Sequence, residues 1–408
     1  MSLVADGRSP VSRLLGVLDI DLRTLALVLV LIASWLVFDL WTGGLFLTPR
    51  NLYNLAVQSS VVAILATGMV LVIVSRHIDL SVGSVLGFVG MVIALLQIEV
   101  FPREAWWNWP LTIVVGLALG ALIGLWHGVW IAYLGLPSFV VTLGGLLIFR
   151  GAAFEVAQGR TLAPFHPTYQ LLGGGAQGSI GPFWSWCFAG VAITILGFLI
   201  WHARVQRSRY ASLGTPILVD ALRFAVIAAV LMAFVATLNA YPVPQSTVGR
   251  GIPVPVLILV AAVVLMEFAA RETRFGRYVY AIGGGKEAAE LAGIKVKRTV
   301  VAVFVLTGVL AGIAAVITTA RLNAGTNSLG SLLELNVIAA AVIGGASLSG
   351  GRGSVSGAIL GAVVIQSLET GLVLVGSTSS VRMIVIGLVL MLAARFDRVL
   401  TRRDGDAA

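Results

Sequence analysis

The sequence predicts an all-α polytopic membrane protein with about 12 (10–12) transmembrane helices, some broken or re-entrant, and with both termini cytoplasmic. Composition is the first reason: of 408 residues, 58% are hydrophobic and only 11% are charged, whereas a soluble domain has roughly 25% charged residues. The second reason is that apolar runs recur along the whole chain. In lipid, such runs satisfy their backbone hydrogen bonds by forming helices.

The predicted spans follow one another closely, and no connection between them is long enough for a nucleotide-binding domain. The spans are Leu25–Leu40, Leu55–Val74, Val82–Gln97, Leu111–Leu134, Phe139–Phe154, Phe183–Trp201, Phe224–Leu238, Val254–Ala270, Val300–Ala320, Leu332–Ala346, Val355–Leu372 and Met383–Ala394. Several are shorter than the about 20 residues of a full span, and glycine and serine interrupt them. We therefore expect breaks or re-entrant pieces around Ser75–Ser84 and Gly344–Gly357.

Basic residues predict the orientation. With the N-terminus in the cytoplasm, 20 Lys and Arg residues fall in inner segments and 5 in outer segments, while Arg150 and Arg382 fall at outer boundaries of spans. Cytoplasmic loops of membrane proteins are rich in Lys and Arg, so both termini should be inside. The net charge of +9 is explained by this bias, and no nucleic-acid partner is expected.

We expect a single transmembrane domain over residues 24–398, flanked by a cytoplasmic segment 1–23 and a cytoplasmic tail 399–408. Residues 173–251 contain two spans around a basic loop, and residues 271–298 form a second cytoplasmic loop with a helical pattern. The N-terminal segment carries acidic residues and no small-residue cleavage site, so it should not be a cleavable signal peptide. One cysteine, Cys187, excludes an intrachain disulfide.

Motifs for catalysis are missing. The run Gly283–Lys286 is followed by Glu287, where a phosphate-binding loop needs Ser or Thr. The four histidines lack metal-ligand spacing, so no metal or other cofactor is expected. Four acids fall in or near the ends of spans: Asp39, Glu267, Glu334 and Glu369. We therefore expect no buried acid or histidine relay for proton coupling, and no enzyme active site.

Glycines that recur every fourth residue predict close contacts between helices. These series are Gly116, Gly120, Gly124 and Gly128; Gly308 and Gly312; and Gly353, Gly357 and Gly361. Helices in lipid associate where small residues let their backbones approach. The glycines are therefore interpreted as packing positions and not as ligand sites.

Four motifs in order carry a resemblance to a known family. They are GMVLVIVSRHIDLSVGSVLG (Gly68–Gly87), LPSFVVTLGGLLIFRG (Leu136–Gly151), RFGRYVYAIGGGKEAAELAGIKVKR (Arg274–Arg298) and AAVIGGASLSGGRGSVSGAILGA (Ala340–Ala362). Together they resemble the membrane permeases of bacterial sugar ABC importers, the ribose, xylose, arabinose and galactoside group, over nearly the whole chain. The additional segment 173–251 makes the layout look most like the xylose permeases.

The resemblance implies a multi-pass protein of the bacterial inner membrane that binds no ATP itself and imports a monosaccharide, xylose or another pentose. Its implied partners are a cytoplasmic ATPase, a periplasmic sugar-binding protein and a second permease chain, with a homodimer expected. Four residues match the family's coupling motif, in which a short helix docks into the ATPase: Glu287, Ala288, Ala289 and Gly293. Gly284, in the glycine turn before that helix, is assigned to the same coupling segment. The Ile-x-Leu-Pro end of that motif is missing here.

The sugar path should be lined by hydroxyl and amide groups, because sugars are uncharged polyols. Six residues near the expected helix breaks are candidates for it: Asp79, Ser81, Ser84, Asn336, Ser347 and Ser349. Helix capping or packing explains each of them equally well. Asn336 also stands where relatives commonly carry Asp, which puts an ionic role at that position in doubt.

Two alternatives belong to other functional classes. An ion-coupled secondary sugar carrier would also have about twelve spans, but it would need a buried acid or histidine relay. A membrane-embedded enzyme, such as an acyltransferase, would need a catalytic constellation that the sequence does not offer. Uptake measurements separate the first alternative from an ATP-driven importer: the importer needs ATP, whereas the carrier needs only a proton or sodium gradient.

Overall fold

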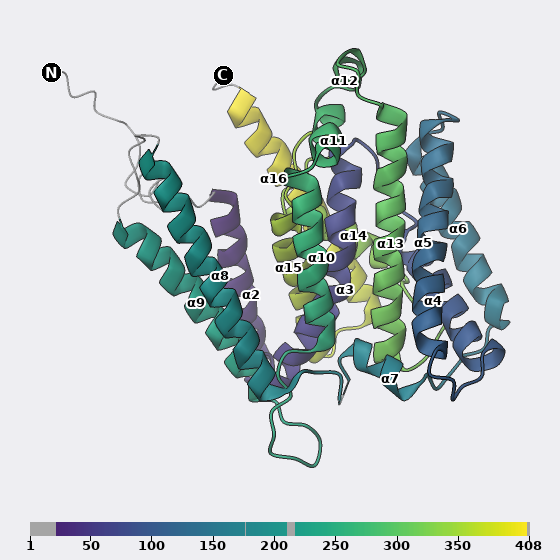
Figure 1. The fold of residues 1–408 in the computed structure, drawn as a ribbon, viewed down its shortest axis with the longest axis vertical. Coiled ribbons are helices and arrows are strands. Elements are labelled where there is room, and N and C mark those ends of the chain that lie inside the picture. The colour runs from purple at the N-terminus through teal and green to yellow at the C-terminus, as the bar shows by residue number, and fades with distance from the viewer. Residues whose placement is uncertain (1–21, 176, 210–216, 406–408) are drawn as a thin grey trace.

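The computed structural model describes residues 22–175, 177–209 and 217–405. The predicted segment 1–23 therefore lies almost entirely outside the described residues, as do parts of the basic loop and of the C-terminal tail. The helices are α2 (Leu22–Trp41), α3 (Pro49–Val74), α4 (Val82–Leu95, continued by a π-helical turn Leu96–Val100), α5 (Asn108–Ala132), α6 (Ser138–Ala157), α7 (Pro167–Gln170), α8 (Gly181–Arg209), α9 (Ile217–Asn239), α10 (Val254–Arg271), α11 (Arg274–Gly284), α12 (Lys286–Leu291), α13 (Val296–Leu322), α14 (Leu333–Ile343), α15 (Val355–Leu374) and α16 (Ser379–Gly405) (Figure 1).

The predicted membrane architecture is confirmed. Among the described residues, ten helices are long and apolar enough to cross a membrane, and Leu333–Ile343 and Ser379–Leu392 are shorter apolar helices. Each of the predicted spans coincides with a helix. The two predicted breaks are also present, because the chain is non-helical between α3 and α4 and between α14 and α15.

Local sequence explains where the long helices begin. Pro49 occupies the first turn of α3, where its missing N–H costs nothing, and the Thr48 side chain accepts the N–H of Asn51 at 3.4 Å. The Ser354 hydroxyl caps α15 in the same way by accepting the N–H of Gly357 at 3.2 Å. These caps satisfy N–H groups that the first helical turn leaves without a partner.

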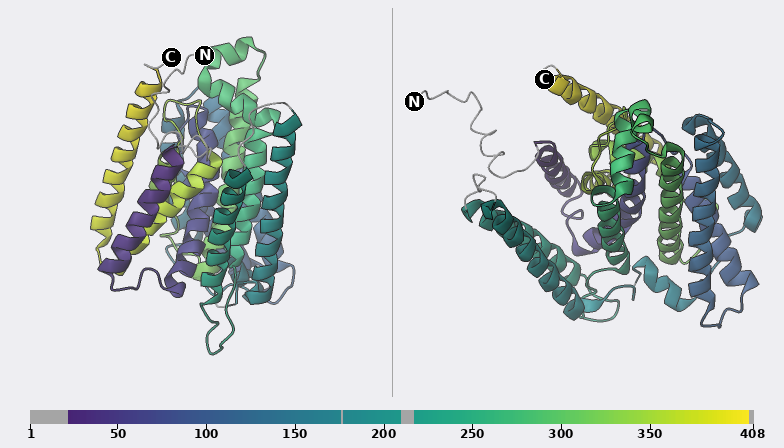
Figure 2. Two further views of the ribbon diagram at one scale, coloured as in Figure 1. Left: turned by 90° about the vertical axis from the view of Figure 1, so that its left-hand side faces the viewer. Right: turned by 45° about the horizontal axis from the view of Figure 1, so that its top comes forward.

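Helix α3 is the centre of the bundle. It packs against α10, α13, α14 and α15, and every residue from Ser59 to Val74 is buried. The α5–α13 pair is the most extensive helix contact, and α4 lies between α13 and α6. In contrast, α8 and α9 pack mainly on each other and form an outlying pair (Figures 1 and 2). The extra segment 173–251 is therefore attached at the edge of the bundle.

The bundle has two ends. The short helices α11 and α12 project from one end, here the α12 end, and α7 lies at the other, the α7 end (Figure 1). Helix α2 begins and α16 finishes at the α12 end. The described parts near both termini therefore lie at the same end as the loop 271–298.

Candidate functional site

The α12 end carries the predicted coupling segment. Thr273 caps α11 by accepting the N–H of Gly276 at 3.3 Å, and a turn at Gly285 separates α11 from α12. Glu287 lies in the first turn of α12, where a negative charge suits the helix dipole. Gly293 then takes the left-handed conformation, with φ of 80°, that lets the chain turn back toward α13.

The faces of α12 differ. Ala289 is buried against the bundle, whereas Glu287 and Ala288 are exposed. Leu291 is 91% exposed, an unusual position for a leucine at a helix end outside the apolar bundle. Sequence reasoning missed Leu291, although an apolar residue two positions before the motif glycine was the available signal.

Hydrogen bonds connect this segment to two helix breaks. The Arg76 guanidinium, in the α3–α4 linker, donates from Nε to the carbonyl of Gly283 at 2.8 Å and from Nη2 to that of Gly284 at 3.1 Å. The Tyr280 hydroxyl donates to the Gly353 carbonyl at 2.8 Å. The N–H of Gly351 donates to the Val74 carbonyl at 2.9 Å. The coupling segment is thus bound to the linkers 75–81 and 344–354.

A cavity of about 630 Å³ opens beside α12, between the α3–α4 linker, the α5–α6 loop and the start of α13. Lys286, Glu290, Lys297 and His77 are among the residues that line it. Burial, aided by the positive charge of Lys286, lowers the pKa of His77 from its ordinary 6.5 to about 4. His77 is therefore neutral at physiological pH.

The predicted path residues do not form one cluster. Asp79 accepts hydrogen bonds through Oδ1 from the Ser81 N–H at 2.8 Å and from the Ser81 hydroxyl at 2.6 Å, and Ser84 follows in the first turn of α4. These three side chains are buried. Asn336 is directed at α15, where its Nδ2 donates to Glu369 at 3.2 Å. Ser347 and Ser349 share a 2.9 Å hydrogen bond in the α14–α15 linker.

Arg150 connects α6 to a distant segment. The sequence places it at the outer boundary of a span, and it lies in the second half of α6. Its Nη1 donates to the Leu329 carbonyl at 2.7 Å and contacts that of Asn327 at 3.5 Å, and its Nη2 donates to the Gly330 carbonyl at 3.1 Å. These carbonyls belong to the non-helical segment 323–332, which was not singled out from the sequence.

One correction concerns Glu334, which the sequence places near the end of a span. Asp79, His127 and Glu334 are all buried in the bundle. Asp79 and His127 line the same small cavity with Thr307, and Glu334 lies against Gly83 at the start of α4. The expectation failed because Glu334 starts a short helix within the bundle and not at its edge. Among the described residues, no group of three or more His, Cys, Asp or Glu side chains could hold a metal ion.

Comparison with known proteins is consistent with this architecture. The family described as "Branched-chain amino acid transport system / permease component" matches residues 51–394. The chain belongs to this family of permeases. The xylose transport system permease protein XylH of Haemophilus influenzae is 39% identical over 326 residues, which are 79% of this chain and 82% of that protein. XylH of Escherichia coli K12 is 39% identical over 332 residues, 80% of this chain and 79% of that protein.

A more distant relative, the ribose import permease protein RbsC of Escherichia coli K12, is 32% identical over 297 residues, 72% of this chain and 69% of that protein. No solved structure matches the chain. The permease is the membrane-spanning subunit of an ABC importer and a multi-pass protein of the inner membrane, and it is not itself an enzyme. Family membership implies an ATPase and a periplasmic binding protein as its partners.

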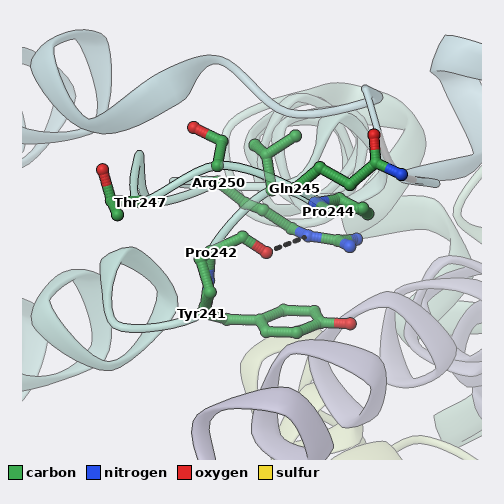
Figure 3. Close-up of a pocket in the computed structure, with 8 residues that line it drawn as sticks. Tyr241, Pro242, Pro244, Gln245, Thr247 and Arg250 are labelled. Atoms are coloured by element: carbon green, nitrogen blue, oxygen red, sulfur yellow. Dashed lines mark hydrogen bonds between the residues drawn. The ribbon is translucent and has the colours of Figure 1, made fainter.

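At the α7 end, the permease has a protruding loop between α9 and α10 with an open pocket of about 570 Å³. Arg250 is buried there over the Tyr241 ring, 4.1 Å from its centroid, and 5.4 Å from that of Tyr53. Its Nε donates to the Pro242 carbonyl at 3.2 Å (Figure 3). These contacts attach the loop to α3, and we interpret Arg250 as a structural residue.

Proposed function

We propose that this permease imports xylose or another pentose. The observation that carries the proposal is that two proteins named as xylose permeases are 39% identical to this chain over about four fifths of its length. The ribose permease relative has lower identity and coverage, so ribose is the weaker candidate. The outlying α8–α9 pair, which accounts for the extra length, is consistent with the xylose-type layout.

We further propose that α12 docks into the ATPase on the cytoplasmic side. The docking residues would be Gly284, Glu287, Ala288, Ala289 and Gly293, with Leu291 added as an apolar anchor. Exposed apolar side chains mark interaction sites, and Leu291 is almost fully exposed. The bonds from Arg76 to the carbonyls of Gly283 and Gly284 would pass a movement of α12 to the α3–α4 linker.

We propose that the functional unit contains two copies of this chain, each with a single permease domain over residues 24–398 and with cytoplasmic termini. The predicted path residues remain part of the proposal: Asp79, Ser81, Ser84, Asn336, Ser347 and Ser349. Since Asp79, Ser81 and Ser84 are buried and hydrogen-bonded here, they would meet sugar only after the helices that bury them move apart.

Reconstitution tests the transport function. The permease, its ATPase and its binding protein are placed in liposomes, and uptake of labelled xylose, ribose and galactose is measured with and without ATP. We expect ATP-dependent uptake with xylose preferred. Uptake by the permease alone under a proton gradient would instead support the ion-coupled carrier, and a preference for a hexose would refute the pentose assignment.

A charge reversal tests the coupling segment. We expect Glu287→Lys to abolish ATP-dependent uptake, because it reverses the charge at the start of α12, while membrane insertion is retained. Glu104→Lys is the matched control, since Glu104 is exposed in the α4–α5 loop at the opposite end. Uptake and ATPase activity are measured for both variants. Normal uptake with Glu287→Lys would contradict the assignment.

A further inference from the structure

The segment 323–332 is non-helical where it runs along α4. Its residues approach successive small residues of that helix: a Cβ on Gly325 would lie 2.5 Å from Ala94 Cβ, and one on Gly87 would lie 2.6 Å from the Leu329 carbonyl oxygen. A Cβ on Gly330 would overlap the Gly83 backbone. The segment therefore passes from the α7 end into the bundle, and α14 begins only at Leu333.

This segment reaches the depth of the membrane core. Arg150, which binds its carbonyls, follows the start of α6 by about 18 Å and precedes its end by about 10 Å, at 1.5 Å per residue. The hydrocarbon core of a bilayer is about 30 Å thick, so a core centred on α6 would contain Arg150 and residues 327–330. Leu332, which has a φ of 61°, and Gly330, which has a φ of 66°, keep this stretch from joining α14.

Part of this region is open at the surface of the described chain. Ser328, Ser331 and Leu332 are exposed, and Arg150 is partly exposed. Leu147, one turn before Arg150 on α6, is also exposed. We call these five residues the Arg150 face.

Lipid cannot cover such a surface at low cost. Irregular backbone at membrane depth is tolerated only where protein buries it or where it lines a water-filled cavity, and an arginine in the hydrocarbon core is expensive. Apolar side chains such as Val230 on α9 and Ile148 on α6 are exposed as a lipid-facing surface requires, whereas Arg150, Ser328 and Ser331 add polar groups that lipid does not solvate. The Arg150 face therefore has the character of a wall in contact with water.

We propose that the Arg150 face lines the sugar path and that Arg150 donates hydrogen bonds to sugar hydroxyl oxygens. This inference rests on the proposed function as a sugar permease. Among the described residues, the Arg150 bonds use Nη1 and one hydrogen of Nη2, which leaves Nε and the second Nη2 hydrogen as donors. The Ser331 hydroxyl beside it can both donate and accept. A neutral polyol matches this set because it supplies many oxygens without a charge.

Water accessibility tests the path. In a Cys187→Ser background, Ser331→Cys and Leu332→Cys are exposed to a membrane-impermeant charged maleimide, with Val230→Cys in α9 as a control at an apolar exposed position. We expect residues 331 and 332 to react and xylose to slow the reaction, while residue 230 stays unreactive. A Cys at 331 that reacts no faster than one at 230 would overturn the proposal.

Uptake kinetics test Arg150 itself. We expect Arg150→Gln to lower uptake about tenfold, since one charge-assisted hydrogen bond to the sugar is lost. Most of the effect should be a higher KM for the sugar-loaded binding protein. Arg160→Gln, an exposed residue paired with Glu99, is the control. Wild-type kinetics with Arg150→Gln would refute the sugar contact. Because labelling needs no ATPase, it separates failure of this inference from failure of the transport proposal. The labelling result also stands if Arg150→Gln does not insert into the membrane.

Discussion

At the scale of single residues, the packing at the α12 end requires a close approach between backbone groups at Gly283. Gly283, in the last turn of α11, lies beside the last residue of α3 and the α14–α15 linker, where the Gly351 N–H bonds to the Val74 carbonyl. A Cβ on Gly283 would overlap the Val74 carbonyl oxygen and lie 2.5 Å from the Gly351 nitrogen. Its neighbour Gly284 has open space on the corresponding side.

We therefore expect Gly283→Ala to destabilise the permease by about 1–3 kcal/mol, the cost of forcing an extra methyl group into a packed site. Gly284→Ala, in the same motif, should be neutral. Thermal unfolding of the two purified variants measures the difference. Equal melting temperatures for both variants would show that the close approach at Gly283 is not required.

His77 gives a pH dependence of stability. In the unfolded chain it takes up a proton near its ordinary pKa of 6.5, whereas burial and Lys286 lower its pKa in the folded protein to about 4. Between these values the unfolded state binds more protons, so stability falls as the pH drops from 6.5 to 4. We expect the melting temperature of His77→Gln to fall less than that of the wild type between pH 7.5 and pH 4.5. Parallel curves would contradict this assignment.

At the scale of elements, glycine spacing determines which helices approach most closely. The backbones of α5 and α13 touch where Gly120 meets Gly308, and Gly124 meets the backbone of Phe304. The same contact recurs between α14 and α15, where Gly344 meets Gly357 and Gly361 meets Ala340. The predicted packing role of these glycines is confirmed, and it follows from the small gain that lipid-embedded helices obtain from burying larger apolar side chains.

Gly120→Ala should weaken the α5–α13 pair, because the new Cβ would overlap the Gly308 carbonyl oxygen. The expected loss is about 1–3 kcal/mol of unfolding free energy. Gly144→Ala on α6 is the control, since a Cβ there meets no atom within 4 Å. Unfolding of both variants in detergent with increasing denaturant gives the comparison. A loss with Gly144→Ala equal to that with Gly120→Ala would contradict the packing interpretation.

At the scale of the whole molecule, orientation and energy source are linked. The helices near both termini and the segment α11–α12 lie at one end, and 20 of the 25 basic residues assigned to loops were assigned to that side. A chain without an ATPase domain needs its docking helix on the side where ATP is present. The same end must therefore face the cytoplasm if the coupling proposal holds.

Reporter fusions test this orientation. We expect a reporter that is active only in the cytoplasm to be active after residue 405, and one placed in the loop 242–249 to be inactive. A reporter that is active only in the periplasm should give the reverse result. Periplasmic activity at the C-terminal position would overturn the orientation and, with it, the docking role of α12.

Much of the architecture was predictable, because composition and the length of apolar runs act locally and need no knowledge of contacts. Each predicted span coincides with a helix, and both predicted breaks are present. The site was less predictable. The coupling segment was found through its motif, whereas the exposure of Leu291 depends on which face of a six-residue helix turns toward the bundle. No sequence pattern in so short a helix specifies that face.

The sequence by itself determined that this protein is a helical membrane permease, where its spans and breaks lie, and which glycines bring helices together. Only the tertiary structure decided which polar groups are buried within the membrane. Arg150 and Leu329 are separated by 179 positions, yet the guanidinium of one bonds to the carbonyl of the other. Where a polar group lies along the bundle depends on how each helix packs against its neighbours. That is a property of contacts between distant segments and not of any local pattern.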